Sequence, residues 1–308
     1  MKFKPVKTFK KRKKKILKNF VKPVTKSDLL GLYQKLGIKA GDIVFVHSAL
    51  STFGKVDGGP QVIIDTLLET VEEEGTLLFP GFNLTKSMAD TMAYYAAGEA
   101  YDYQDSTPTT GIICRVFKQE YDPCISIHPT HSVLAKGKLA QVFTSEHHLA
   151  DSSFGKGTPL YKLLSHNAKI IGLGSSFGRL TFVHVIEDVV NNFPINVYKD
   201  QSYKVRLIDN EGNTIQKTFV AHCPQNSRID HLIKGSYIRR KFWNTLRQRK
   251  QLKTHKVNQA RSWAINARDL YNLQEELAQE KITIYTEPKG IFKKITYKFL
   301  GLLDELNS

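Results

Sequence analysis

The chain has 308 residues, with 45 Lys and Arg against 29 Asp and Glu, and a mean hydropathy of -0.32. Its length excludes a small disulfide-held scaffold, and no apolar run reaches the roughly 20 residues that a membrane-spanning helix requires. The three cysteines, Cys114, Cys124 and Cys223, form no Cys-x-x-Cys pair, which favours a reducing compartment and argues against a zinc site. The basic N-terminus has no apolar core behind it, so we expect no signal peptide and a cytoplasmic protein.

The positive charge is concentrated in two segments. Residues 1–22 hold eleven Lys or Arg and no acid, and residues 228–256 hold ten against one acid. Residues 23–227 have seventeen basic and twenty-one acidic residues, a net charge of −4. The basic excess is therefore confined to the N-terminal segment and to one segment in the C-terminal part of the chain, and the residues between them are mildly acidic.

These boundaries predict three parts. Residues 1–24 form a polybasic arm, which is either a solvated tail or a segment attracted to an anionic membrane at about 1 kcal/mol per basic residue. Residues 25–285 form the main domain. Residues 286–308 form a basic amphipathic tail, because apolar side chains recur at helical spacing over residues 291–306, and this tail either docks on the domain or lies at the membrane interface.

Apolar periodicity and turn residues predict alternating helices and strands in the first half of the chain. Helices are expected over residues 25–38, 60–71, 112–117 and 160–164, and buried strands over residues 43–46, 76–79, 133–135 and 169–174. Residues 82–104 show no clear period and are predicted to be a long loop or a mobile helical lid. This order, with short loops, is typical of an α/β sandwich.

The second half is predicted to contain a β-hairpin and two helices. Residues 203–208 and 214–220 alternate around Asn210-Glu211-Gly212, which is a hairpin signal. Residues 228–256 are interpreted as a basic helix, and residues 267–277 as an ordinary one.

His184 and Glu187 are the leading catalytic candidates. They stand three apart in residues 180–188, so in a helix both side chains lie on one face. A carboxylate in that position orients the imidazole and stabilises its protonated form, as a general base at neutral pH requires.

Several separate stretches resemble the aminoglycoside N3-acetyltransferase family, also called the antibiotic acetyltransferase family, over residues 26–280. The matching motifs are His47-Ser48-Ala49-Leu50 with Gly54 and Gly58-Gly59, Glu74-Gly75-Thr76-Leu77, Thr107-Pro108 with Gly111, His128-Pro129-Thr130-His131-Ser132, Phe154-Gly155 with Pro159, and Gly172-Leu173-Gly174 before His184-x-x-Glu187. Residues 257–273 also look like the family's closing helix. The order and spacing of these motifs carry the resemblance.

The resemblance implies a three-layer α/β/α sandwich with a mixed central sheet, distinct from the GNAT acetyltransferases. It implies transfer of an acetyl or short acyl group from acetyl-CoA to an amine of an amino sugar, by direct attack in a ternary complex and without a metal. His184 is then the general base and Glu187 its orienting partner.

Other residues receive roles on the same resemblance. Thr107, His131 or Ser132 supplies the oxyanion donor and contacts the acyl-CoA, and the sequence does not choose among them. His47, Ser48, Ala49, Leu50 and Gly54 are expected to cradle the phosphates of CoA at a strand end.

The remaining polar residues are interpreted as structural. His128 is expected to hold its turn, Asp188 to be a helix-surface charge, and His147 and His148 to lie in a surface loop. His222 beside Cys223 lacks partners for a metal.

The acceptor is either an aminoglycoside or, as we favour, a nucleotide- or lipid-linked amino sugar of surface polysaccharide, with the enzyme held at the inner membrane face. An aminoglycoside is a polycation, and a polybasic arm brings no advantage in binding one. The alternative is a nucleic-acid- or membrane-binding protein on an inactive acyltransferase scaffold, but no recognised nucleic-acid motif accompanies the basic segments. The oligomeric state is left open.

Overall fold

The computed structural model describes residues 22–84, 87–222 and 237–286. The basic arm up to residue 21, the segment before α9 and the amphipathic tail lie outside these residues, so the expectations about them stay predictions. None of the helices in the described part of the chain is both long and apolar enough to cross a bilayer.

A seven-stranded mixed sheet forms the centre, in the order β3-β4-β2-β1-β5-β9-β8. The three central strands, β2, β1 and β5, are parallel, and the outer strands are antiparallel to their neighbours. The strands are β1 Ile43–Ser48, β2 Thr76–Pro80, β3 Cys124–Ile125, β4 Val133–Gly137, β5 Lys169–Leu173, β8 Lys253–Val257 and β9 Ala260–Asn266.

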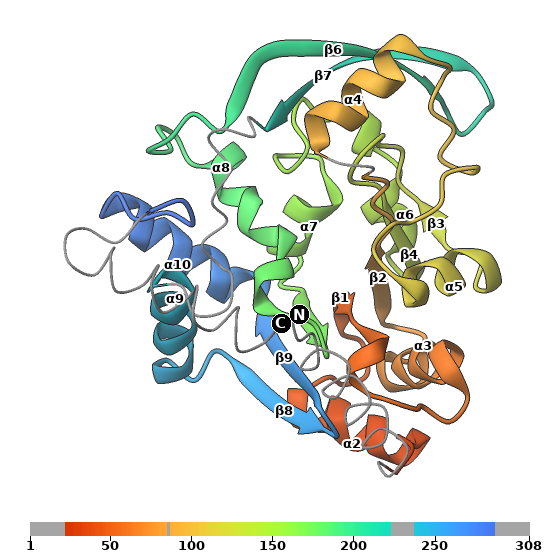
Figure 1. Ribbon diagram of the computed structural model, residues 1–308, viewed down its shortest axis with the longest axis vertical. Helices are drawn as coiled ribbons and strands as arrows, with labels where there is room; N and C mark the ends of the chain where they lie inside the picture. The colour runs from red at the N-terminus through yellow and green to blue at the C-terminus, as the bar shows by residue number, and fades with distance from the viewer. Residues whose placement is uncertain (1–21, 85–86, 223–236, 287–308) are drawn as a thin grey trace, which may run out of the picture.

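Helices cover both faces of the sheet, so the expected three-layer α/β/α sandwich is confirmed (Figure 1). The core on one face includes side chains from α2 Lys26–Leu36, α3 Gly59–Val71 and α5 Ile112–Glu120. The core on the other face includes side chains from α6 Ala140–Thr144, α7 Pro159–Ser165, α8 Val185–Val189, α9 Tyr237–Gln248 and α10 Ala267–Gln279. Short 3-10 turns span Leu50–Thr52, His147–Leu149, Phe177–Arg179 and Thr181–His184.

Helix α2 shows how local sequence sets an element's bounds. Thr25 Oγ1 accepts the N–H of Asp28 at 3.3 Å, and the Asp28 carboxylate accepts the N–H of Thr25 at 2.9 Å. This capping box begins the helix. Gly37, at a φ of 77°, ends it in the left-handed region that favours glycine.

A second, smaller unit lies beside the sandwich. Strands β6 Tyr198–Ile208 and β7 Thr214–His222 form the expected hairpin, and it packs on α4 Met88–Ala97 through a separate apolar cluster (Figure 1). Residues 82–104, for which a loop or a helical lid was predicted, therefore contain a helix. The capping box of Ser87 and Asp90 begins α4.

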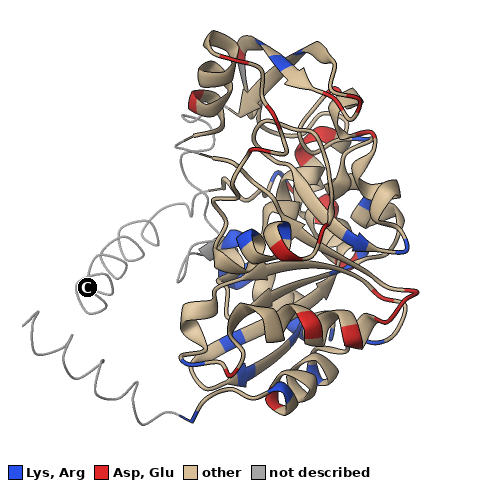
Figure 2. Ribbon diagram, turned by 90° about the vertical axis from the view of Figure 1, so that its right-hand side faces the viewer, with Lys and Arg blue, Asp and Glu red and all other residues tan. Residues whose placement is uncertain are grey.

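Two helix predictions near the C-terminus are wrong. The basic helix predicted over residues 228–256 does not include residues 253–256, which lie in the edge strand β8. The closing helix predicted over residues 257–273 does not include residues 260–266, which form β9. Helix α9 ends at Gln248, and Lys250 has a φ of 58°, which a continuing helix cannot accommodate. The body carries Lys and Arg interspersed with Asp and Glu on the face shown in Figure 2.

Candidate active site

His184 and Glu187 lie on one continuous helical segment, formed by the 3-10 turn Thr181–His184 and α8. The buried Val183 and Val185 fix this segment in the core. From α10, the Gln274 side chain donates a 2.8 Å hydrogen bond to the carbonyl of Val183. The expected helical placement of the pair is confirmed.

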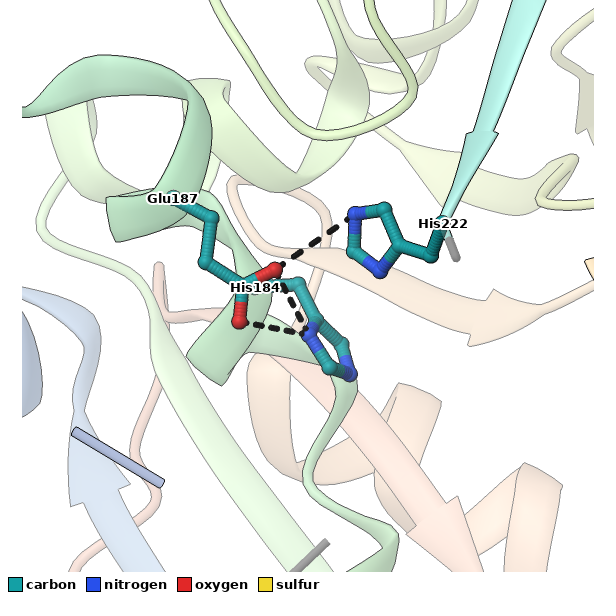
Figure 3. A group of neighbouring side chains, drawn as sticks. All are labelled: His184, Glu187 and His222. Carbon is teal, nitrogen blue, oxygen red and sulfur yellow. Dashed lines mark hydrogen bonds and ion pairs between the residues drawn. The ribbon is translucent and has the colours of Figure 1, made fainter. Parts of the chain in front are cut away.

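The two side chains meet directly. His184 Nδ1 lies 3.1 Å from both Glu187 Oε1 and Oε2, and the other ring nitrogen points away from the carboxylate (Figure 3). Tyr285, beyond α10, donates a hydrogen bond to Glu187 Oε1 at 2.8 Å. The Glu187 side chain is 0% exposed, whereas that of His184 keeps 23%. The carboxylate is thus sealed from water while the imidazole stays reachable.

His222, at the end of β7, is the third member of the cluster. Its Nε2 lies 3.4 Å from Glu187 Oε2, without the alignment of a hydrogen bond (Figure 3). One ligand-type atom from each of His184, Glu187 and His222 lies within 4.8 Å of the others, so the expectation that His222 lacks partners is wrong. Two neutral imidazoles and a carboxylate are a donor set that zinc accepts.

Phe154 lies between His131 and the His184–Glu187 pair, which is called the dyad below. Its ring centroid lies 5.2 Å from that of His184 and 4.8 Å from that of His131. The carboxylate of Asp188 accepts the backbone N–H of Phe154 at 3.0 Å and the hydroxyl of Tyr198. Asp188 is therefore not a helix-surface charge, as expected from the sequence, but the residue that holds Phe154 against the dyad.

Buried histidines line the side of the site next to the dyad. This histidine wall consists of His128, His131, His147 and His222, and His128 and His147 pack behind His131. His128 Nδ1 accepts the N–H groups of Thr130 at 3.2 Å and His131 at 3.0 Å, which confirms its role in holding the turn. His147 stacks on His128 at 4.6 Å and bonds Ser126 at 2.8 Å. His147 is 1% exposed, so its assignment to a surface loop is wrong.

Burial controls the charge state of this wall. It lowers the pKa of His128, His131, His147 and His222 well below the usual range, since water no longer solvates the charged form. Repulsion from His184 adds to the lowering for His131 and His222. These imidazoles are neutral near pH 7. Burial raises the pKa of Asp188.

The expected oxyanion candidates differ in burial. His131 is buried, and its Nδ1 lies 2.9 Å from Thr130 Oγ1. Ser132 is buried with its hydroxyl 3.5 Å from that of Tyr101. Thr107 is exposed on the loop before α5.

The residues expected to cradle phosphates lie at the end of β1. His47 belongs to the strand itself, is 5% exposed, and has a ring centroid 6.4 Å from that of Trp263. Burial lowers its pKa to about 4. The N–H of Ala49 is donated to the carbonyl of Leu173 at 2.9 Å, so it is not available to a phosphate.

The other members of this motif lie close by. Ser48 ends β1, Leu50 begins a 3-10 turn, and Gly54 follows it with a φ of 80°.

A cavity of about 600 Å³ opens between α5, α6 and the β6–β7 turn, and its lining includes Lys118 and Cys124. Neither residue of the dyad lines it. Cys114 and Cys124 are free thiols.

A sequence model of the family described as aminoglycoside 3-N-acetyltransferase matches residues 45–279. The chain belongs to this family. The match includes the dyad, the buried histidine wall and the central strands, and the members are enzymes, unlike an inactive binding scaffold.

Known members of the aminoglycoside 3-N-acetyltransferase family resemble the chain in sequence and in fold. The prophage-derived aminoglycoside N(3')-acetyltransferase-like protein YokD of Bacillus subtilis is 31% identical over 188 residues, which cover 56% of this chain and 68% of YokD. The structure of AAC-IIIb in a binary complex with CoASH has a TM-score of 0.70 at 22% identity and covers 87% of this chain and all of that one (100%). The structure of AAC-VIa bound to sisomicin has a TM-score of 0.69 at 22% identity, and the match covers 84% of this chain and 99% of AAC-VIa.

Proposed function

We propose that the protein is a cytoplasmic N-acetyltransferase that moves an acetyl group from acetyl-CoA to an amine of an aminoglycoside or a related amino sugar, with His184 as the general base. The observation that carries the proposal is the His184–Glu187–Tyr285 arrangement, in which a sealed carboxylate holds a solvent-reachable imidazole. Family membership and the CoA-bound and sisomicin-bound relatives support the two substrate classes.

In this mechanism the amine nitrogen forms a bond to the thioester carbonyl carbon, and the carbon–sulfur bond breaks as CoA leaves. Nε2 of His184 takes a proton from the nitrogen and returns it to the departing sulfur. Glu187 accepts the hydrogen bond of Nδ1 and offsets the positive charge of the imidazolium. The proton lost by the amine is the one gained by the thiol of CoA, and no atom changes its oxidation state, so the step needs no oxidant or reductant.

The acceptor we favour is an amino sugar on an anionic carrier, either a nucleotide or a membrane lipid of surface polysaccharide. This preference is supported by the charge distribution, since residues 1–22 and 228–256 together hold twenty-one basic residues against one acid. Such segments attract phosphates and anionic lipids. An aminoglycoside is the other acceptor.

The test is release of free thiol from acetyl-CoA in the presence of single amines. Aminoglycosides are compared with UDP- and dTDP-amino sugars, each across a range of concentrations. His184→Ala is expected to lower kcat/KM by about 10²- to 10⁴-fold, which is the usual contribution of a positioned base. His166→Ala, which removes an exposed histidine beyond α7, is the matched control and leaves the rate unchanged.

Two results would contradict the proposal. The base is not His184 if His184→Ala keeps more than about a tenth of the wild-type rate. Tight nucleic-acid binding with a steep salt dependence, together with no thiol release with any amine, would favour a binding protein instead.

A further inference from the structure

The carboxyl ends of β1 and β5 mark the place where a ligand is expected. Strand β1 is parallel to β2 on one side and to β5 on the other, so the chain's progression through the sheet reverses at β1. Open α/β sheets bind ligands in the crevice outside the strand ends at such a reversal. In this chain Ser48 pairs with Leu173 there, and the chain continues into the turn at residues 174–176.

Strand β9 brings two side chains towards this turn. The indole of Trp263 donates a 2.9 Å hydrogen bond to the carbonyl of Ser175, and an added Cβ at Gly172 would lie 2.2 Å from the Trp263 ring. Gly172 is therefore required by the packing of Trp263. Arg261, two residues before Trp263, projects from the same face of β9 because side chains alternate along a strand.

Helix α9 supplies a second guanidinium. Arg239 Nη1 lies 3.5 Å from Ser176 Oγ, and the guanidinium lies 6.0 Å from the centre of the Trp243 ring. Arg239 is half-buried, and its pKa is lowered first by that burial and then by repulsion from Arg261. Two guanidinium groups thus converge on one short turn at the expected ligand edge of the sheet.

A third positive charge lies next to them. Lys256 of β8 is directly opposite Arg261 in the β8–β9 register, and like charges in that position destabilise a sheet. Neither Lys256 nor Arg261 takes part in an ion pair with another described residue. A bound anion removes the repulsion. Guanidinium groups match a phosphate well because their planar donors reach two of its oxygens at once.

We propose that Ser176, Arg239 and Arg261 form a binding site for phosphate groups, with Lys256 adding charge at its edge. The inference rests on the proposed function, in which acetyl-CoA brings phosphates and a thioester to the same sheet edge. A phosphate on the acceptor, as in a nucleotide-linked amino sugar, has the same chemistry. The site binds and orients substrate, and the reacting atoms lie elsewhere, at His184.

The test compares acetyl-CoA with S-acetyl-pantetheine, which has the same thioester arm but no phosphate. The double variant Arg239→Gln/Arg261→Gln is expected to raise KM for acetyl-CoA by roughly 10- to 100-fold, as the loss of charged hydrogen bonds does. Its kcat, and its kcat/KM with S-acetyl-pantetheine and an aminoglycoside, stay at the wild-type values. That second rate also shows that the variant is folded.

Arg249→Gln is the matched control. Arg249 follows α9 directly, and its variant loses one positive charge where the double variant loses two. Its guanidinium pairs with Glu276 at 2.7 Å, away from the proposed phosphate ligands. We expect no change in KM for either donor. An increase in KM for acetyl-CoA as large as that of the double variant would mean that general charge and not this site attracts CoA, and would overturn the proposal.

Comparing two acceptors identifies whether the bound phosphate comes from CoA or from the acceptor. If the double variant loses rate with S-acetyl-pantetheine and a UDP-amino sugar, but not with S-acetyl-pantetheine and an aminoglycoside, the site holds the acceptor's diphosphate. Equal losses with all donors and acceptors, or no loss with any, would overturn the site.

Direct binding separates this site from the proposed function. Wild-type protein, the double variant and Arg249→Gln are titrated with CoA and with inorganic pyrophosphate, without an acceptor. Weaker binding by the double variant alone supports the phosphate site even if no amine is acetylated. Equal affinities in all three proteins would contradict it even if acetylation is found.

Discussion

The hydroxyl of Tyr285 donates to Oε1 of Glu187 at 2.8 Å, joining residues 98 positions apart in the chain. The same carboxylate accepts a hydrogen bond from Nδ1 of His184. Tyr285 is 9% exposed, so this hydrogen bond lies in the protein interior, where its electrostatic effect is strong. The segment after α10 therefore helps to determine how strongly Glu187 stabilises a protonated His184.

Tyr285→Phe is expected to shift the pH profile of acetyl transfer. The tyrosine hydroxyl draws negative charge from Glu187, so its loss leaves more charge to stabilise the imidazolium. The imidazolium of His184 is then better stabilised, and the acidic limb of kcat/KM moves to higher pH. The profile is measured from pH 5.5 to 9 with thiol release as the readout.

Tyr271→Phe is the control for that change. Tyr271 lies on α10, and its hydroxyl contacts Glu275 instead of the dyad. Its removal is expected to leave the acidic limb in place. A Tyr285→Phe profile that only falls in height, with no movement along the pH axis, would mean that Tyr285 supports folding without tuning the base.

The alternation of apolar runs predicted the central strands and most helices, because these elements are buried on one or both faces. Strand β8 could not be predicted in this way. Four of its five residues are exposed, and it is held by backbone pairing with β9, which leaves no hydrophobic signal. Strand β9 was missed for a related reason, since Ser262 and the alanines give it no β-type pattern despite their burial.

In the candidate site too, some residues could be predicted from the sequence and others could not. His184 and Glu187 were predictable because they lie on a single turn of helix, where spacing fixes proximity. Tyr285 and His222 reach the dyad through the fold, from positions 101 and 38 residues from His184, and local spacing carries no information about such contacts. Asp188 was misinterpreted because its partner Tyr198 comes from the hairpin.

Acid is expected to destabilise the protein through its buried histidines. Burial lowers the pKa of His47 to about 4 and lowers those of His128, His131 and His147 well below the usual range. A histidine with a folded pKa below its unfolded value of about 6.5 binds more protons when unfolded. Its stabilising contribution is complete above about pH 6.5 and is lost as the pH falls towards the folded pKa, at up to about 1.4 kcal/mol per unit.

Urea unfolding at pH 7.5, 6.5, 5.5 and 4.5 measures this loss. His47→Asn is expected to reduce the slope of the unfolding free energy against pH, whatever its effect on absolute stability. His166→Asn, at an exposed position, leaves the slope unchanged. A free energy of unfolding that is flat from pH 7.5 to 4.5 would contradict neutral burial of these rings.

Membrane association is expected to depend on residues 1–22. The eleven basic residues of this segment attract anionic lipid at about 1 kcal/mol each near the surface. In sedimentation with vesicles, the full chain is expected to pellet with phosphatidylserine-containing vesicles, and less so at high salt because salt screens the attraction. Equal recovery on neutral and anionic vesicles, with and without residues 1–22, would remove the membrane hypothesis.

Removing metal ions is expected to leave catalysis intact, although His184, Glu187 and His222 lie within 4.8 Å of one another. In the proposed mechanism Nδ1 of His184 carries the hydrogen that Glu187 accepts, and a metal on that nitrogen would replace it. Acetyl transfer after dialysis against EDTA should therefore equal that of untreated enzyme.

Added zinc should inhibit, because a cation at Nδ1 withdraws electron density from the ring and weakens Nε2 as a base. His222→Asn removes one of the three ligands and should raise the zinc concentration needed for half inhibition by at least about 10-fold, a loss common when metal-site residues are changed. An enzyme that loses its activity in EDTA and regains it with zinc would show instead that the three side chains hold a catalytic metal, and the role of Glu187 as the partner of the base would have to be abandoned.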